Sequence, residues 1–420
     1  MKKLILPILV GACFTSLLWA AESAAEAEQP KALTLQAAVQ KTLQQNPRLY
    51  QFDFARQRLL STRQTSDLKP AYQLGLELEN FAGTGEIEGA DSAELTVALS
   101  SVIELDSKRQ SRVAVVDARL DAFDLERQAQ TLDVLGELTN SFIQLLSTQQ
   151  ELALAAEAVA LSESLHSTVQ KRAHSGAASD AEVLRARAML MQSKIQKNDL
   201  QRRLQRQKIS LVRFWGSTTA EFTTVEGDLF AFGESRKFST LYDQVQQSPA
   251  VTVFASELRL KNAEVRLAQT QSRADIGWQF GVRRFEATGD AGLTLGLSVP
   301  LFTDSRNRGA VEAALAERNA LQYRRSDHVL ALHDRLYSAY SQRKQFIAAH
   351  QQLKQNIIPD LEKALIITRE AYERGRLKYQ DLITAQQELL GAKQRLIETA
   401  TAAMLNQAVI EQLTAEPLTN

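Results

Sequence analysis

The sequence is poor in turn-forming residues and in cysteine. Its 420 residues include 18 Gly and 8 Pro, about half of the roughly 12% found in an average soluble chain, so few and long elements are expected. Aromatic residues make up 6% although apolar residues reach 44%, a balance typical of extended helical interfaces. The single cysteine, Cys13, excludes an internal disulfide and a cysteine-based zinc site.

An excess of either charge is also missing, because 49 Lys and Arg residues balance 49 Asp and Glu residues. This balance argues against a nucleic-acid partner. The sequence contains no nucleotide-binding loop, no Gly-x-Ser-x-Gly elbow and no metalloprotease helix motif. Its five histidines form no pair at ligand spacing on one helical face. We therefore expect no catalytic residue, no cofactor and no resident metal site.

The N-terminus has the pattern of a secretory signal. Two lysines precede an apolar run that ends in small residues at Ala20 and Ala21, which predicts a cleaved signal peptide at residues 1–21 and a polar leader at 22–32. The segment ending at Cys13 loosely resembles a lipoprotein cleavage site, so lipidation remains an alternative to its removal. No later segment supplies the ~20 apolar residues of a membrane helix, so an exported chain that enters a membrane must do so as strands.

Three segments recur in one order at a nearly constant spacing of about 200 residues. The pairs are residues 46–49 with 248–251, 101–109 with 298–306, and 172–184 with 372–383. Such self-similarity predicts a tandem duplication. We place the first structural repeat at 33–215, an irregular connector at 216–239, the second repeat at 240–412 and a C-terminal tail at 413–420.

Each half contains a predicted β-hairpin, at about 72–103 and at about 276–302. Large apolar residues alternate there with polar or small ones, the period of a strand with one apolar face. Each strand is about ten residues long, which matches the ~9–11 residues of a tilted membrane strand. The residues expected to face water inside a barrel are Gln73, Glu77, Glu79, Glu94, Thr96, Gln279, Arg283 and Thr294.

A half-buried sheet of a soluble domain is the alternative reading of these hairpins. The polar face and the aromatic residues near the strand ends favour membrane strands. Four strands cannot close a barrel, and an open sheet edge is not tolerated in lipid. Insertion into a lipid membrane therefore requires an oligomer.

The rest of each half is predicted to be a long helical hairpin. Residues 108–171 contain no Pro and a single Gly, and apolar residues there follow the heptad spacing of a coiled coil. The same spacing continues in the returning helix and in the second half. The tips of the two hairpins are expected at Gly176 and Gly375, and Pro359 is expected to bend the second hairpin.

With these features the chain resembles the TolC family of outer-membrane efflux ducts over nearly its whole mature length. The phrase Leu-Glu-Leu-Glu-Asn-Phe at 76–81, the Ile-Glu-Leu of 103–105 and the tip pattern of 372–382 carry the resemblance. The Glu-Asn-Phe phrase and the short length are most similar to the CzcC-like heavy-metal branch. That branch usually has Leu-Pro-Asn-Pro where this chain has Leu-Lys-Pro-Ala at 68–71, and Gly-Gly where it has Asp106-Ser107.

The resemblance implies a mainly α fold with a β-barrel part. Its form would be a homotrimer with a twelve-stranded barrel that continues into a periplasmic tunnel of helices. It implies passive conduction with a periplasmic adaptor (membrane fusion protein) and an inner-membrane pump of the resistance-nodulation-division (RND) class, with heavy-metal cations as substrate. A duct for drugs or other organic compounds, or for type I secretion, is the alternative. A periplasmic coiled-coil adaptor and a structural coiled coil of the envelope remain as other classes.

The helical tips are the expected gate and adaptor contact. The residues assigned to this role are Gly176, Ser179, Asp180, Glu182, Gly375, Arg376, Lys378 and Asp381. Ser179 and Glu182 also fit a capping box, whereas Lys378 cannot cap. The resemblance implies that three copies of Asp381 form a cation-attracting ring, and stabilisation of the helix dipole is the alternative role for this acid.

Overall fold

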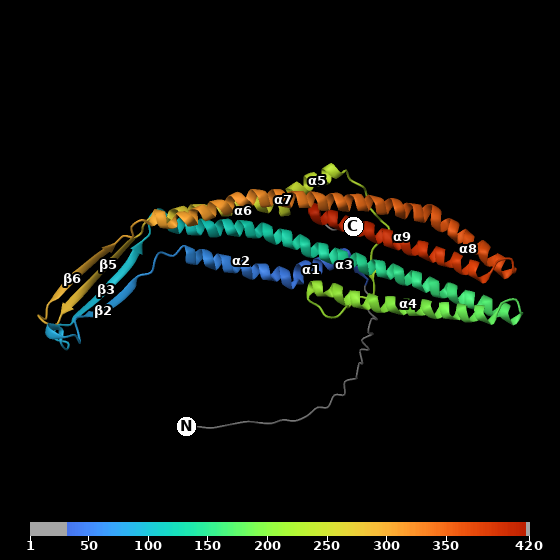
Figure 1. The fold of residues 1–420 in the computed structure, drawn as a ribbon, viewed down its shortest axis with the longest axis horizontal. Helices are drawn as coiled ribbons and strands as arrows, with labels where there is room; N and C mark the ends of the chain where they lie inside the picture. The colour runs from blue at the N-terminus through green and yellow to red at the C-terminus, as the bar shows by residue number, and fades with distance from the viewer. Residues whose placement is uncertain (1–31, 417–420) are drawn as a thin grey trace, which may run out of the picture.

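The computed structural model describes residues 32–416. The expected signal peptide, Cys13, nearly all of the polar leader and the end of the tail lie outside the described residues. The molecule is elongated, with a β-sheet at one end and the tips of two helical hairpins at the other (Figure 1). None of the helices between residues 32 and 416 is long and apolar enough to cross a lipid bilayer.

The order of elements helix, β-hairpin and long helical hairpin occurs twice. The first set of helices is α1 (Leu35–Gln45), α2 (Pro47–Ser66), α3 (Lys108–His174) and α4 (Asp180–Val212). The second set is α5 (Phe238–Gln247), α6 (Pro249–Gln271), α7 (Thr303–Gln352), α8 (Ile358–Glu373) and α9 (Tyr379–Thr414). Short 3-10 turns occupy η1 (Gly85–Ile87) and η2 (Arg213–Trp215). Both α2 and α6 begin at a proline, whose missing N–H is tolerated in a first helical turn.

The four long strands form one antiparallel sheet in the order β2-β3-β5-β6. Their bounds are β2 (Gln73–Glu79), β3 (Glu94–Ile103), β5 (Ile276–Phe285) and β6 (Ala291–Ser298). The expected length of about ten residues is correct for β3 and β5 and wrong for β2 and β6, which have 7 and 8 residues. The two shorter strands are the edges of the sheet, where hydrogen-bonded partners are present on one side only.

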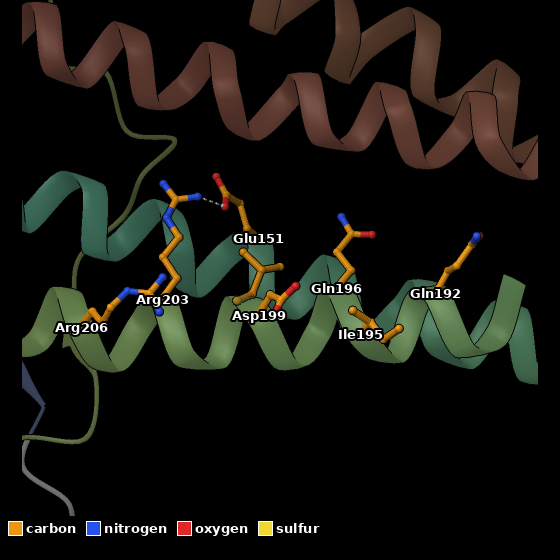
Figure 2. A pocket seen from close by; sticks show the side chains of 8 residues that line it. Glu151, Gln192, Ile195, Gln196, Asp199, Arg203 and Arg206 are labelled. Carbon is orange, nitrogen blue, oxygen red and sulfur yellow. Dashed lines mark hydrogen bonds and ion pairs between the residues drawn. The ribbon is translucent and has the colours of Figure 1, made fainter. Parts of the chain in front are cut away.

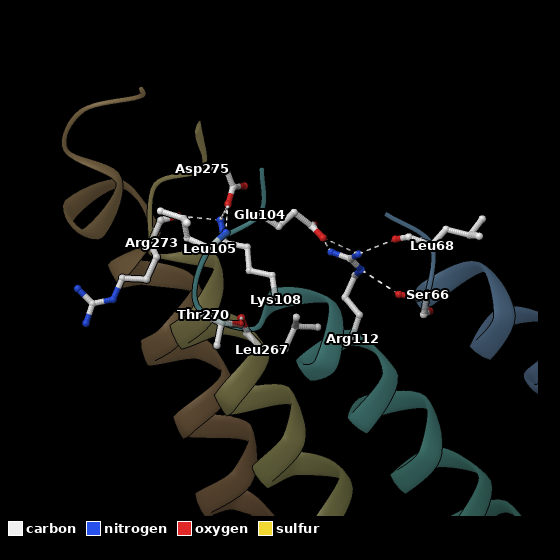
Figure 3. Close-up of polar contacts among 10 residues, drawn as sticks. All are labelled: Ser66, Leu68, Glu104, Leu105, Lys108, Arg112, Leu267, Thr270, Arg273 and Asp275. Carbon is white, nitrogen blue, oxygen red and sulfur yellow. Dashed lines mark hydrogen bonds and ion pairs between the residues drawn. The ribbon is translucent and has the colours of Figure 1, made fainter. Parts of the chain in front are cut away.

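Two cations in the first turns of α3 join the helices to the sheet (Figure 3). Lys108 Nζ lies 2.7 Å from Asp275 Oδ1 and donates to the Arg273 carbonyl at 2.7 Å, just before β5. Arg112 pairs with Glu104 and donates to the carbonyls of Ser66, the last residue of α2, and of Leu68, which follows α2. Side chains from α3 therefore hold the ends of α2 and α6.

Because strands and helices are joined in this way, the order of the helices follows the order of the strands. Helix α3 packs against α2 and α6, and α6 packs against α7. In the other half of the molecule α3 packs against α4 and α9, and α9 against α8. Helix α3 has 67 residues, about 100 Å at 1.5 Å per residue, and runs from the sheet to the tip (Figure 1).

A wide π-helical turn, η3 (Leu353–Ile357), separates α7 from α8. Pro359 lies in the first turn of α8, two residues after this turn. The second hairpin changes direction in this region (Figure 1). The expected bend therefore coincides with a π-turn, a frequent cause of helix kinks.

The connector expected to be irregular is packed against the helices. It contains the short strand β4 (Val225–Glu226), which pairs in parallel with β1 (Leu33–Thr34). Phe222, Val225 and Leu229 are buried in the same apolar cluster as Leu138 and Leu145 of α3. Two residues are too few to show a strand period in a sequence, so this pairing was not expected.

The turn between β3 and α3 contains two non-glycine residues in the left-handed conformation. Asp106 has a φ of 55° and Ser107 a φ of 60°. These are the positions at which the CzcC-like branch usually has Gly-Gly. Glycine adopts this conformation without a steric cost, whereas other residues lose about 1–2 kcal/mol.

Replacing Ser107 with Gly should raise the midpoint of thermal unfolding, because the exposed Ser107 side chain caps nothing and its backbone strain would be relieved. The expected gain is about 1 kcal/mol. Circular dichroism in detergent checks this. The matched control, Ser326→Gly at an exposed position inside α7, should instead lower the midpoint, and the same sign for both variants would contradict the explanation.

Candidate functional site

The eight residues predicted to face water share one face of the sheet. Directly opposed residues of antiparallel strands point to the same side. The register pairs Glu77 with Thr96 and Thr96 with Arg283. By the same register, Gln73, Glu79, Glu94, Gln279 and Thr294 belong to this face. Thr96 itself is buried, and its hydroxyl accepts a hydrogen bond from Arg283 Nε at 2.9 Å.

The first helical tip turns at Gly176, which has a φ of 75°. Ser179 is the N-cap of α4, and its hydroxyl accepts a hydrogen bond from the Glu182 amide at 3.3 Å. The Glu182 carboxylate does not complete the expected capping box. It accepts instead from the Tyr372 hydroxyl of the second hairpin at 3.2 Å, because that partner comes within reach when the two hairpins pack together. Asp180 is exposed in the first turn of α4.

The second tip turns at Gly375, also with a φ of 75°. Lys378 is the N-cap of α9 and, as expected, supplies no side-chain acceptor. Its backbone N–H donates to Asp381 Oδ2 at 2.9 Å, so Asp381 caps the helix from the third position. Arg376, Lys378 and Asp381 are exposed. The structure thus gives Asp381 a capping contact and leaves its side chain open to the solvent.

An arginine–tyrosine contact joins the two tips. Arg172 of α3 donates to the backbone carbonyls of Tyr372 and Glu373, and to that of Ala177 at 3.1 Å. Its guanidinium carbon lies 4.4 Å from the centre of the Tyr372 ring, a cation–π geometry. Burial, and secondly the neighbouring Glu182 carboxylate, raise the pKa of Tyr372 to about 12. The hydroxyl therefore remains protonated and able to donate at neutral pH.

The sequence interpretation assigned no role to Arg172 or Tyr372. Both lie one helical turn before a tip glycine, which is the signal that could have identified them. Tyr372 is 2% exposed and packs near Tyr379, with ring centres 6.4 Å apart. Of the predicted residues, Glu182 contacts this pair directly, whereas Gly176, Ser179, Gly375 and Asp381 form the turns and helix starts of the two tips.

A groove between α3 and α4 lies farther from the tips (Figure 2). Its lining residues are Glu151, Gln192, Ile195, Gln196, Asp199, Leu200, Arg203 and Arg206. Arg203 Nη1 lies 3.2 Å from Glu151 Oε2, so the groove contains an ion pair between the two helices. Burial raises the pKa of Glu151, and the charge of Arg203 opposes that shift.

Within residues 32–416 no group of three or more His, Cys, Asp or Glu side chains is arranged to hold a metal ion. The candidate functional sites are therefore the polar face of the sheet and the joined helical tips.

Two solved structures of membrane proteins share the fold of this chain. The structure of CusC, described as forming a transmembrane channel, matches with a TM-score of 0.76 at 16% identity, over 91% of this chain and 92% of that one. The outer membrane protein VceC of Vibrio cholerae matches with a TM-score of 0.73 at 17% identity, over 92% and 97% of the two chains.

The model of the outer membrane efflux protein family matches residues 38–217 and 240–416, and the chain belongs to that family. The cobalt-zinc-cadmium resistance protein CzcC of Cupriavidus metallidurans is 22% identical over 302 residues, 72% of each chain. The pyoverdine export outer membrane protein OpmQ of Pseudomonas putida is 24% identical over 278 residues, 60% of this chain and 58% of that one.

Membership confirms the expected resemblance, the fold class and the location in the outer membrane. Proteins of this family are transport channels rather than a class of enzymes. They are trimeric and work with adaptor and inner-membrane pump partners.

Replacing Arg172 with Gln should loosen the second tip, because the backbone carbonyls of Tyr372 and Glu373 lose a charged donor. Hydrogen bonds of charged groups contribute about 1.5–3 kcal/mol, so amide exchange in residues 372–382 should accelerate about tenfold or more. Hydrogen-exchange mass spectrometry measures this rate. Lys171→Gln removes the same charge from the exposed neighbouring position and should leave the rate unchanged. Equal rates in the two variants would refute a role for Arg172 in joining the tips.

Proposed function

We propose that the chain is the outer-membrane channel of a tripartite RND-type efflux system and passively conducts heavy-metal cations from the adaptor and pump to the outside. The similarity to the cobalt-zinc-cadmium resistance protein, over 72% of both chains, carries this proposal. The energy for export would come from the pump.

A strain that lacks this chain should accumulate more zinc, cobalt or cadmium after exposure to the salts, and the wild-type gene should restore export. Metal content per cell, measured by mass spectrometry, checks this. Unchanged metal content in the deletion strain would refute metal cations as the substrate.

Export of an organic compound is the second candidate, because a relative named for pyoverdine export matches 60% of the chain. In that case the deletion strain would retain or become sensitive to organic compounds while its metal content stayed the same. Growth tests with both classes of compound separate the two candidates.

The open edges of the subunit support a homotrimer. Strands β2 and β6 form the edges of the sheet, and the helices that continue from them, α2 and α7, form the edges of the helical layer. On α7 the side chains of Tyr323, Leu330 and Tyr337 are 71%, 70% and 56% exposed. They recur every seven residues, on the side of α7 opposite its buried residues Leu332 and Leu336.

The other edge helices expose apolar side chains in the same way. Phe54 of α2 is 72% exposed, Ile195 of α4 is 60% exposed and Ile367 of α8 is 67% exposed. Exposed apolar stripes of this kind mark association surfaces. A neighbouring copy that places its α2 and α4 against α7 and α8 would cover all of them.

In the same assembly, one face of the sheet would contact lipid and the other would contact water. On the face opposite the eight polar residues, Leu74, Leu76, Leu293, Leu295 and Leu297 are each more than 70% exposed. Three copies that pair β2 with the β6 of a neighbour would close a twelve-stranded barrel. These leucines would then contact lipid, and Gln73, Glu77 and Gln279 would line the water-filled lumen.

Replacing Leu330 with Asp should prevent the trimer, because an unpaired carboxylate would be buried at the α7 edge. Light scattering after size-exclusion chromatography in detergent measures the oligomeric state. The control Gln322→Asp changes an exposed residue about 80° away from Leu330 around α7 and should leave the trimer intact. A trimeric Leu330→Asp variant would contradict this interface.

The joined tips are proposed as the periplasmic gate and the adaptor contact. Arg172 and Glu182 hold the second hairpin through Tyr372, so separation of the tips requires these contacts to break. Three copies of the exposed Asp381 would then ring the narrow end of the tunnel, and such rings favour cations.

Replacing Asp381 with Ser should reduce the cation selectivity of single channels in planar bilayers. Asp381→Asn removes the charge but keeps an acceptor for the Lys378 amide, so it should reduce selectivity equally and preserve the helix start. The control Asp360→Asn removes an exposed acid of α8 and should leave the selectivity unchanged. The gate assignment fails if Asp381→Ser leaves both conductance and selectivity unchanged.

A further inference from the structure

One guanidinium on the polar face joins three strands of the sheet. Arg283 of β5 places Nη2 2.8 Å from Glu79 Oε2 on β2, and Nη1 2.8 Å from Glu94 Oε2 on β3. Its Nε donates to the Thr96 hydroxyl at 2.9 Å. The side chains of Arg283, Glu79 and Glu94 are 29%, 40% and 21% exposed, so the cluster is half-buried and remains open to water on this face.

Arg283 stands against an excess of acids. Among the residues of the four long strands that the structure describes, its face carries Glu77, Glu79 and Glu94 but no other Lys or Arg. The hairpin loops at 80–93 and 286–290 contain five further acids and again no Lys or Arg. Arg283 therefore supplies the positive charge that partly neutralises the acids on this face.

The cluster lies at the end of the sheet that is farthest from the helices. Glu79 ends β2 and is paired directly with Glu94, the first residue of β3, across the first hairpin loop. Arg283 is paired with Gly292, the second residue of β6. Figure 1 places these loops opposite the helical tips. In the assembled channel, three such clusters would surround the outer opening.

We propose that Arg283 is a specificity-determining residue that limits the cation preference of the outer opening. By holding Glu79 and Glu94 it cancels part of their charge, and it leaves Glu77 of the same face to attract cations. This inference rests on the proposed function, because it requires three chains around a conducting lumen. At the ~8 Å screening length of physiological salt, one charge per subunit changes the local cation concentration about two- to threefold.

The reversal potential of single channels under a KCl gradient in planar bilayers tests this proposal. Arg283→Gln should raise the permeability ratio of K⁺ to Cl⁻ about two- to threefold. Arg284→Gln is the matched control, because the next residue points to the opposite face, where it lies 3.4 Å from Glu286. It removes the same charge and should leave the ratio unchanged. Equal ratios for the two variants would overturn the proposal.

Two further variants keep the test decisive if Arg283→Gln does not form channels. Glu94→Gln removes one partner of Arg283 and should lower the ratio, and an unchanged ratio would overturn the proposal. The exchanged pair Glu94→Arg with Arg283→Glu retains the ion pair and should restore the wild-type ratio. Absence of any conductance in the wild-type trimer would refute the proposed function itself, whereas a conducting wild type with insensitive variants would refute only the role of Arg283.

Discussion

The passage from strand to helix depends on two cations at the start of α3. The Lys108 side chain is only 9% exposed, and a charge so far removed from water must be paired. Lys108 holds the segment between α6 and β5, and Arg112 holds the segment between α2 and β2. Three passages between helix and sheet therefore meet in one place, and the helices leave the sheet in the order of their strands.

The matching order of strands and helices determines where a single subunit leaves strand edges unpaired and apolar side chains exposed. The outermost strands lead into the outermost helices, so the unpaired strand edges and the exposed apolar stripes lie along the same two margins. In a single subunit, only the inner strands and helices have neighbours on both sides. In the proposed trimer, association with copies of itself would pair the edge strands and bury the exposed apolar side chains of the edge helices in one arrangement.

Local patterns were sufficient to predict the strands, the shared face of eight polar residues and the glycine tips. Alternation, heptad spacing and left-handed glycines are set by neighbours in the sequence. The contacts between Arg172 and Tyr372, and between Arg283 and Glu94, join residues 200 and 189 positions apart. Such pairs depend on how the hairpins pack against each other and produce no periodic pattern in the sequence. The departure from Gly-Gly at Asp106 and Ser107 was visible in the sequence, but its physical meaning required the backbone angles.

The π-turn between α7 and α8 adds one residue to the seven-residue spacing of buried side chains. Leu336, Arg343 and His350 are buried at intervals of seven residues, and so are Ile358, Leu365 and Tyr372. The interval from His350 to Ile358 is eight, and the wide turn that absorbs the extra residue lies between them. One additional amino acid thus divides a coiled-coil seam into two phases, so that the same continuous helix presents one register to the middle of the molecule and another to its tip.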